Sequence, residues 1–425
     1  MPETRLLRPI RDQRIYVALA MNLTLGKGLI CPDIEAVDLE KIPPALSKRL
    51  VVSEAVQAGY FRGLVPIGEP TAFWLPFYPL FLSLLLKLAG DYLFFLRLAQ
   101  SFLGAALVVP VYFITDKMYR HKEWGIIAAV LTACWPFFIY YSAVIMTETL
   151  YILLLTCLVA VIVLYQTKYH WIWPLLSGAL AGTTFLTRSV MLGLVPLLAL
   201  VLLIYAPNRR KGILAGASFI LVFIICVAPW LVRNYQIFGV YQFLPTKGGP
   251  TFWSRNNPLF LQQELESTRF SGINPAQFEN EKLLHFPSFQ TENEIERNVI
   301  LYQRMLVFIK KYPATYLKLC LVKFRWLLSP FSGHKTPLWQ KSISLLTYGV
   351  TLFLALIGLV KFREHRKNDY ILVILLGYFI LFHSLVNGDT RFRIPLDIFF
   401  IILAAPLYHR IIQWCIRKLP QQIGS

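Results

Sequence analysis

The sequence predicts an all-α polytopic membrane protein, a bundle of about nine transmembrane helices with a large segment outside the membrane. Its composition is the first indication, because 56% of the 425 residues are hydrophobic and only 15% are charged, whereas a soluble domain has about 25% charged residues. The mean hydropathy of +0.55 agrees with this. A chain of this length could not bury so much apolar surface in soluble cores, so we expect most of it to lie in lipid.

Long apolar runs are the second indication. A helix needs about 20 mostly apolar residues to cross a hydrocarbon core of ~30 Å. The runs that approach this length are 92–115, 124–146, 149–166, 172–187, 190–206, 212–232, 341–360, 370–386 and 394–412.

These runs divide the chain into four regions. Residues 1–91 form an extracytoplasmic first loop, and residues 92–232 hold six spans. Residues 233–340 form a mostly helical extracytoplasmic segment, and residues 341–425 hold three spans and a cytoplasmic tail.

The third indication is the placement of the cations that give the chain its net charge of +19. Alternate connections and the C-terminal tail hold 14 Lys and Arg, whereas the short connections between them hold only Arg188, Arg391 and Arg393. The positive-inside rule therefore places the first set in the cytoplasm. The segment 233–340 is then outside, and its 13 Lys and Arg do not contradict the rule, which does not govern long translocated regions.

Several helices are expected outside the lipid core. The run 74–89 contains Pro76 and Pro79 and is too short for a span, which indicates an interfacial or re-entrant helix. Residues 15–25 could lie flat on the outer surface as an amphipathic helix. Acidic residues at the start and Lys310-Lys311 at the end predict a helix over 292–311, and an amphipathic stretch follows at 316–328.

Several function classes have no support. The lipid-like composition excludes a soluble nucleic-acid-binding protein, so no nucleic-acid partner is expected. Walker A, G-x-S-x-G and H-E-x-x-H motifs are missing from the sequence. The cysteines show no C-x-x-C spacing, and four lie in apolar runs where Cys acts as a small hydrophobic residue.

Ionisable groups at the outer ends of the spans are the candidate functional residues. Placing a charge near lipid costs free energy, so such residues usually have a function. The planar guanidinium of Arg binds phosphate oxygens in pairs, and a carboxylate can take a proton from an acceptor hydroxyl. This pattern suits a lipid-linked phosphate. The candidates are Asp12, Glu148, Arg188, Arg233, Lys247, Arg391 and Arg393.

Each candidate also has a structural interpretation. Asp12 could form a surface ion pair within Arg11-Asp12-Gln13-Arg14, and Glu148 could open a helix capped by Thr147. Arg188 could mark a turn between helices or extend its side chain to the membrane surface.

Two further motifs suggest ligand contacts. Arg391 and Arg393 alternate around Phe392, which would place both on one side of an extended segment as an anion site. Lys247-Gly248-Gly249-Pro250 could bring backbone close to a ligand, and Asn256-Asn257-Pro258 could donate hydrogen bonds to a sugar, although ordinary turns use the same residues.

Seven short motifs occur in one order over nearly the whole chain. They are Asp12-Gln13-Arg14-Ile15-Tyr16 through Gly26-Lys27-Gly28, Pro76-Phe77-Tyr78-Pro79-Leu80-Phe81-Leu82, Tyr140-Tyr141-Ser142 through Glu148 and Leu150, Leu186-Thr187-Arg188, Pro229-Trp230 with Arg233-Asn234-Tyr235 and Gly239, Gly248-Gly249 with Asn256-Asn257-Pro258, and Arg391-Phe392-Arg393-Ile394-Pro395. In this order they resemble type C glycosyltransferases of the dolichyl-phosphate-mannose protein mannosyltransferase and aminoarabinose transferase superfamily, which are family 39-like.

The resemblance implies a multi-pass membrane enzyme with the type C fold, in a bacterial-type inner membrane, with its active site facing outward. Such an enzyme transfers a sugar, with inversion, from a polyprenyl-phosphate carrier to a protein, lipid or glycan acceptor. Asp12 would be the outer-loop acid and Glu148 the second acidic position, with Arg188, Arg391 and Arg393 on the lipid phosphate. The remaining residues assigned to substrate are Tyr16, Glu69, Tyr78, Arg233, Lys247, Asn256 and Asn257.

The resemblance leaves some points open. The family has a transmembrane helix before the first motif, and here 11 residues precede Asp12, which suggests a misassigned start or a truncated, non-catalytic member. The acidic stretch 33–40 has no counterpart in the family pattern. Asp12, Glu69 and Glu148 could hold a divalent metal if the fold brings them together. A transporter or flippase of lipid-linked sugars is the rival from another class, and it would require inverted repeats and broken helices at the middle of the bilayer.

Overall fold

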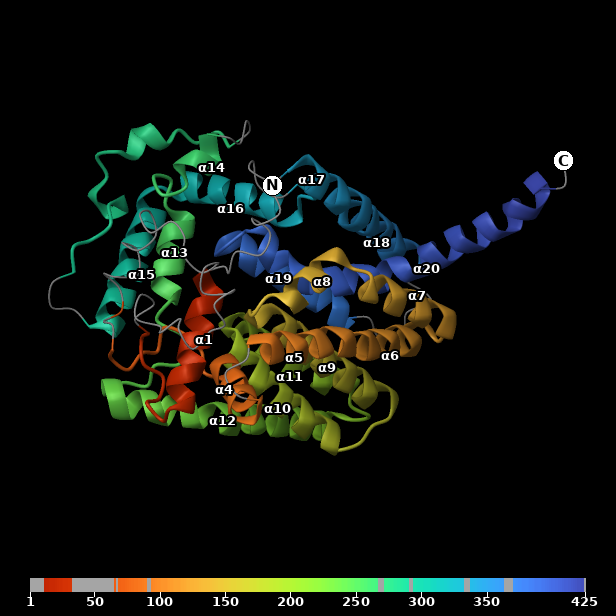
Figure 1. Cartoon of the computed structure of the whole chain (residues 1–425), viewed down its shortest axis with the longest axis horizontal. Helices are drawn as coiled ribbons and strands as arrows, with labels where there is room; N and C mark the ends of the chain where they lie inside the picture. Colours follow the sequence, from red (N-terminus) through yellow and green to blue (C-terminus); the bar gives the residue numbers. More distant parts are fainter. Residues whose placement is uncertain are drawn as a thin grey trace.

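The described secondary structure is helical, with one isolated bridge between Ile30 and Pro70. The computed structural model describes residues 11–32, 65, 68–89, 93–266, 271–289, 293–331, 337–362 and 370–423 (Figure 1). The acidic stretch 33–40 lies outside these residues. The side chain of Asp12 also lies outside the description, although its backbone belongs to helix α1 (Arg11–Thr24).

Within the described part of the chain, five helices are long and apolar enough to cross a membrane. They are Leu93–Tyr119, made of α5 (Leu93–Ala106) and α6 (Val108–Tyr119); α9 (Thr147–Thr167); α12 (Arg209–Phe238); Leu338–Lys361, which ends with α18 (Val350–Lys361); and Thr390–Lys418 within α20 (Thr390–Ile423).

The other predicted spans are also helical but differ in form. Helices α7 (Lys122–Ala133) and α8 (Pro136–Ala143) meet at a bend of 49°, because Trp135 adopts an extended conformation before Pro136. Three apolar helices are shorter: α10 (Ile172–Thr187), Ser189–Tyr205 with α11 (Leu194–Tyr205), and α19 (Tyr370–Leu385). All nine predicted runs are therefore helical, while the count of nine crossings is not established.

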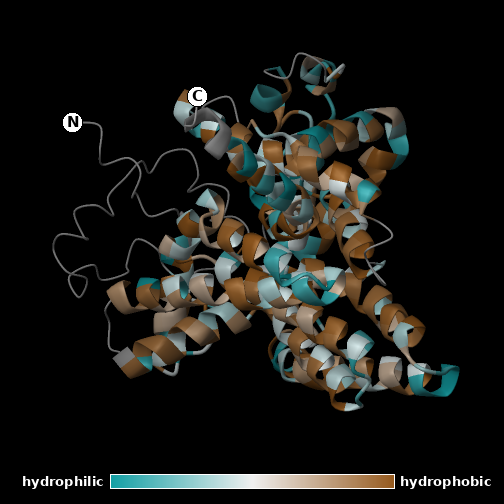
Figure 2. Cartoon of the chain, turned by 90° about the vertical axis from the view of Figure 1, so that its right-hand side faces the viewer, coloured by the Kyte–Doolittle hydropathy of each residue, from teal (hydrophilic) through white to brown (hydrophobic). Residues whose placement is uncertain are grey.

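Helices α9 and α20 form the centre of the bundle. Of the apolar window of each, 78% is buried, against 28% for α12. Helix α12 exposes a row of large apolar side chains that includes Leu221, Ile224 and Ile225. Figure 2 shows such residues along the outside of the bundle helices, the surface expected to contact lipid.

Helix α10 packs closely on α12 through two glycines, Gly178 and Gly182. A Cβ at Gly178 would lie 2.5 Å from the Phe219 carbonyl oxygen, and one at Gly182 would lie 2.5 Å from Cys226 Cβ. The spacing G-x-x-x-G is typical of close helix contacts in membranes, because small residues let two backbones approach. It also fixes the end of α10, where Arg188 follows.

The segment 233–340, called the outer segment after its expected side of the membrane, contains two long helices, as the sequence predicts. Helix α15 (Glu294–Lys311) begins with a capping box between Asn293 and Glu296, and α16 (Pro313–Leu328) follows directly. The short helix α13 (Gly248–Asn256) packs against α15, where Gly249 N–H donates to Asn298 Oδ1 at 2.7 Å. These helices lie toward the left and top of Figure 1, away from the projecting end of α20.

Helices are present where the sequence predicts them near the N-terminus, and their expected position at the membrane surface stays a prediction. Helix α1 packs on α4 (Phe77–Ala89), and its Ile15 and Leu19 enter the main core. The segment before α4 is fixed by Glu294, whose Oε1 accepts from the Ala72 N–H at 3.0 Å and from the Thr246 hydroxyl. The first outer loop and the later outer segment are thus joined.

Candidate functional site

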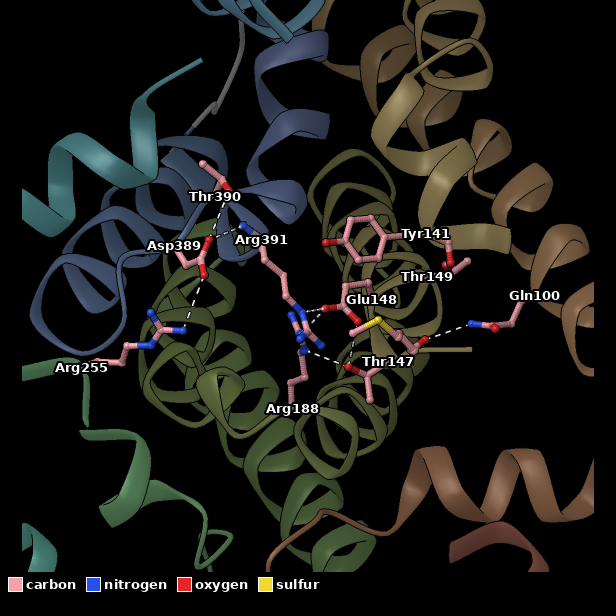
Figure 3. A network of polar contacts seen from close by, with 11 residues as sticks. Gln100, Tyr141, Thr147, Glu148, Thr149, Arg188, Arg255, Asp389, Thr390 and Arg391 are labelled. Carbon is pink, nitrogen blue, oxygen red and sulfur yellow. Dashed lines mark hydrogen bonds and ion pairs between the residues drawn. The ribbon is translucent and has the colours of Figure 1, made fainter. Parts of the chain in front are cut away.

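Glu148 is the centre of a buried ion-pair network at one end of the bundle. Its carboxylate is fully buried in the first turn of α9. Oε1 accepts from Arg188 Nη2 at 2.8 Å and from Arg391 Nε (Figure 3). The two arginines follow α10 and begin α20, so three segments far apart in the sequence meet at this carboxylate.

The turn that begins α9 fixes the carboxylate. Thr147 donates its hydroxyl to Glu148 Oε2 at 3.3 Å and accepts from Arg188 Nε at 3.1 Å. The predicted role of Thr147 as helix cap is wrong, because the capping position is Met146 and no side chain caps the helix there. Thr147 instead links the carboxylate to Arg188.

Arg188 is oriented by its own backbone and by two aromatic rings. It lies in an extended conformation immediately after α10, and its guanidinium carbon is 5.4 Å from the ring centre of Tyr151 and 5.7 Å from that of Phe392. The Arg188 side chain is 14% exposed and that of Arg391 is 27% exposed. Both cations therefore reach toward solvent while Glu148 holds them from the buried side.

A second carboxylate, Asp389, extends the network. It accepts from the Thr390 hydroxyl at 3.2 Å and the Arg391 N–H at 3.4 Å, and it lies 3.7 Å from Arg255 Nη2. Three arginines and two carboxylates leave one formal positive charge in this network. Such a cluster is suited to binding an anion through guanidinium groups.

Arg393 does not belong to this cluster, and the predicted extended segment around Phe392 is wrong. Residues 390–423 are helical, so positions 391 and 393 point in different directions. Arg393 is 1% exposed, donates to the Ser329 carbonyl at 2.6 Å and lies 3.4 Å from Asp397. It faces the bundle interior, where Trp135 donates to the same Asp397 at 2.9 Å.

The first outer helix approaches the start of α9. Gln13 Oε1 accepts from the Ile145 N–H at 3.4 Å. Because Ile145 precedes Glu148 by three residues, this contact brings the first turn of α1 near the start of α9. Tyr16 and Tyr78 pack edge to face at 5.0 Å. The buried hydroxyl of Tyr78 has no hydrogen-bond partner among the described residues.

Other residues assigned to substrate contact protein groups elsewhere. Arg233 donates to the Thr71 carbonyl at 2.9 Å and the Leu29 carbonyl at 3.0 Å. Asn257 donates to the Leu284 carbonyl at 2.7 Å, and Lys247 lies immediately before α13. Arg233 thus joins the end of α12 to residues of the first loop, and the Asn257 contact lies within the segment 233–340.

The expected metal ligands are only partly described. Glu69 is exposed, and the Asp12 side chain lies outside the described residues. Among the described residues there is no group of three His, Cys, Asp or Glu side chains that could hold a metal.

Sequence reasoning missed Arg255, Asp389, Asp397 and Lys323. Asp397 carried a signal, since it is an acidic residue inside an apolar run and follows Arg393 by one helical turn. Arg255 and Lys323 lie among the many cations of the outer segment, where nothing in the sequence distinguishes them.

Comparison with known proteins finds a family model that matches part of the chain and solved structures of similar fold. Residues 69–232 match the family model described as dolichyl-phosphate-mannose-protein mannosyltransferase, a range that includes Tyr78, Glu148 and Arg188. No curated protein matches the chain significantly.

Solved membrane glycosyltransferases share the fold. The archaeal oligosaccharyltransferase AglB from Archaeoglobus fulgidus, in complex with an inhibitory peptide and a dolichol-phosphate, is 14% identical with a TM-score of 0.54 over 100% of this chain. A second structure of an Archaeoglobus fulgidus oligosaccharyltransferase, tethered with an acceptor peptide, is 15% identical with a TM-score of 0.53 over 99% of this chain. This chain spans 50% of the length of each.

ArnT from Cupriavidus metallidurans, bound to undecaprenyl phosphate, is 11% identical over 95% of this chain and 74% of its own, with a TM-score of 0.42. The family match agrees with the resemblance over residues 69–232, and the part of the chain that the structure describes has the helical type C glycosyltransferase fold.

Proposed function

We propose that this chain, a member of the type C glycosyltransferase fold, transfers a sugar from a polyprenyl-phosphate-linked donor to an acceptor on the extracytoplasmic face, with inversion. The observation that carries the proposal is the pair of partly exposed guanidinium groups of Arg188 and Arg391, which the buried carboxylate of Glu148 holds. Two comparisons support it. The family that residues 69–232 match is named for a dolichyl-phosphate-linked sugar, and the archaeal enzyme of the same fold was solved with a dolichol-phosphate.

The two arginines act on the carrier phosphate. As the bond between the sugar C1 and the phosphate oxygen breaks, the electron pair stays on the phosphate, and negative charge grows there. Guanidinium groups fixed in advance stabilise this charge, with about 3 kcal/mol for a well-placed donor. Glu148 has the role of fixing both guanidinium groups, so that little reorganisation is needed during the reaction.

The acceptor requires a base on the opposite side of the sugar. Asp12 has this role: it takes the proton of the acceptor hydroxyl while the acceptor oxygen attacks C1 from the face opposite the phosphate, which inverts the configuration. The contact between Gln13 and Ile145 supports this placement, because it brings the start of α1 next to the start of α9. The apolar outer surface of the bundle suits the isoprenoid tail.

Transfer of labelled sugar from a panel of polyprenyl-phosphate sugars by the full chain in nanodiscs tests the proposal. Arg188→Gln and Arg391→Gln should each lower the rate by a factor of roughly 100, the loss of one charge-stabilising donor. Arg304→Gln is the control, because Arg304 lies on α15 outside the Glu148 ion-pair network and donates to the His285 carbonyl at 3.1 Å.

Two outcomes would count against parts of this assignment. A wild-type chain that transfers no sugar from any donor contradicts the function as a whole. Unchanged transfer by Asp12→Asn removes the role of Asp12 as base but leaves the phosphate site standing.

A further inference from the structure

Lys323 is a buried cation in the outer segment that the proposed reaction does not use. Its side chain is 1% exposed on α16. The ammonium donates to Asn256 Oδ1 at 2.5 Å and to the Leu385 carbonyl at 2.6 Å, and it lies 5.6 Å from the ring centre of Tyr316. A lysine buried to this degree needs partners, and its partners here come from α13 and α19.

Each acceptor of these hydrogen bonds belongs to the last residue of a helix, Asn256 of α13 and Leu385 of α19. Leu385 is the last residue of α19, and the final carbonyls of a helix have no partner within it. A cation at this end also interacts favourably with the helix dipole. Asn256 assists, because its Nδ2 donates to the next carbonyl, that of Val386, at 3.4 Å.

The segment 386–389 lies directly against α16. A Cβ at Gly388 would be 2.4 Å from both Lys323 Cβ and the Lys323 carbonyl oxygen, so only glycine permits this approach. The segment then leads into α20, where the Phe392 N–H donates to the Asp389 carbonyl at 3.0 Å. Arg391 lies in this first turn, three residues after Gly388.

Burial lowers the pKa of Lys323 to about 8, and the positive charge of Arg255 acts in the same direction. The cause is the 1% exposure of the Lys323 side chain. At neutral pH it is charged and can donate hydrogen bonds to both the Leu385 carbonyl oxygen and the Asn256 amide oxygen.

We infer that Lys323, Asn256 and Gly388 form an anchor that fixes the segment 386–389 and so positions Arg391 against Glu148. The inference rests on the proposed function in that Arg391 is taken to hold the carrier phosphate. Lys323 and Asn256 are then positioning residues, and Asn256 acts through the protein backbone instead of contacting sugar.

Hydrogen exchange of the whole chain in nanodiscs tests the anchor without any ligand. Lys323→Met keeps a side chain of similar bulk but removes the charge and the hydrogen bonds, and it should speed exchange of the amides of residues 386–392 by roughly tenfold or more. The matched control is Lys318→Met on the same helix, since Lys318 is exposed and donates to the Gly272 carbonyl at 3.1 Å, away from the segment 386–389. Gly388→Ala should act in the same direction, which keeps the test informative if Lys323→Met fails to fold.

Binding of undecaprenyl phosphate, measured for Lys323→Met, Arg391→Gln and the double variant, tests the route of action. If Lys323 acts through Arg391, each single variant weakens binding, and the double variant binds no more weakly than Arg391→Gln alone. A purely structural role of Lys323 would give additive losses.

Unchanged exchange at 386–392 in both Lys323→Met and Gly388→Ala would overturn the anchor, and additive binding losses would overturn its action through Arg391. If the wild-type chain does not bind undecaprenyl phosphate, the proposed function fails, and the exchange result alone decides whether the anchor exists.

Discussion

Glu148 illustrates how one residue sets both the stability and the chemistry of the site. It is the buried partner of two arginines, so its removal leaves two neighbouring cations without their shared carboxylate. We expect Glu148→Ala to lower the free energy of unfolding by about 3–5 kcal/mol, the usual effect of breaking a buried ion pair from one side. Thermal unfolding of the purified chain in detergent measures this.

Glu281→Ala is the control for Glu148→Ala, because Glu281 also pairs with a cation, Lys311, at 2.7 Å, but the Lys311 side chain is 54% exposed. Solvent screens such a pair, so its loss should have a much smaller effect on the unfolding temperature. Equal effects of the two substitutions would show that the Glu148 pair is not stabilising.

At the residue scale, the sequence predicted Glu148, Arg188 and Arg391 because ionisable side chains at the outer ends of apolar runs are unusual. It failed for Arg393 because the local pattern was interpreted as extended. In a helix two residues apart point in very different directions, so Arg391 reaches Glu148 while Arg393 pairs with Asp397.

At the scale of helices, hydropathy located every apolar run, since burial in lipid acts on length and composition. The bend between α7 and α8 depends on Pro136 and its preceding residue, and Pro136 was within the predicted run 124–146. Packing between helices requires knowledge of the neighbour, and this is why the contact of Gly178 and Gly182 with α12 became visible only in the structure.

The α10 and α12 contact makes a prediction about glycine. Gly178→Leu should force the two helices apart and lower the free energy of unfolding by about 1–3 kcal/mol, as overpacking does. Gly377→Leu on α19 is the matched control, because nothing lies within 4 Å of a Cβ there. The unfolding temperature should therefore fall for Gly178→Leu and stay near the wild-type value for Gly377→Leu. A fall of equal size in both variants would point to a helix-propensity effect and contradict the packing argument.

The first turn of α15 makes a prediction about pH. Burial raises the pKa of the Glu294 carboxyl above its usual value of 4.5, although its hydrogen bonds act in the opposite direction. As pH rises past 4.5, the unfolded chain loses this proton first, so the folded chain holds more protons and its stability falls.

Glu294→Gln does not titrate at this position but keeps an oxygen for the Ala72 N–H. The unfolding temperature of the wild type minus that of Glu294→Gln should therefore decrease from about pH 5 to pH 7. A difference that stays constant or increases over this range would mean that the charged carboxylate is the favoured form.

At the scale of the whole molecule, the sequence placed the candidate acids and arginines at one end of the bundle but could not state which of them meet. The network joins residues 148, 188, 255, 389 and 391, which come together only when α9, α10, α13 and α20 pack. Long-range packing of this kind depends on the shapes of whole helices. Arg233 is an example of what the sequence does not predict. It is expected at the same end of the bundle, yet its guanidinium donates to the Thr71 and Leu29 carbonyls and not to the network.

The orientation of the whole molecule is a prediction that cysteine labelling can decide. The positive-inside rule places the connection between α6 and α7 in the cytoplasm and the outer segment on the other side. Lys122 and Gln277 are exposed residues of these two regions. In a chain whose exposed Cys134 and Cys415 are replaced by Ser, Gln277→Cys should react with a membrane-impermeant maleimide in intact cells, and Lys122→Cys should react only after the cells are opened.

The result bears directly on the proposed reaction, because the arginine pair and α13 of the outer segment meet through Asp389 and Arg255. If Gln277→Cys is labelled in intact cells, the segment 233–340 and the phosphate site next to it face outward, as the proposed transfer to an extracytoplasmic acceptor needs. If Lys122→Cys is labelled first, the site faces the cytoplasm, and the choice of a polyprenyl-phosphate donor loses this support. Labelling of both positions after opening shows that each cysteine is reactive, so that protection in intact cells reports the membrane alone.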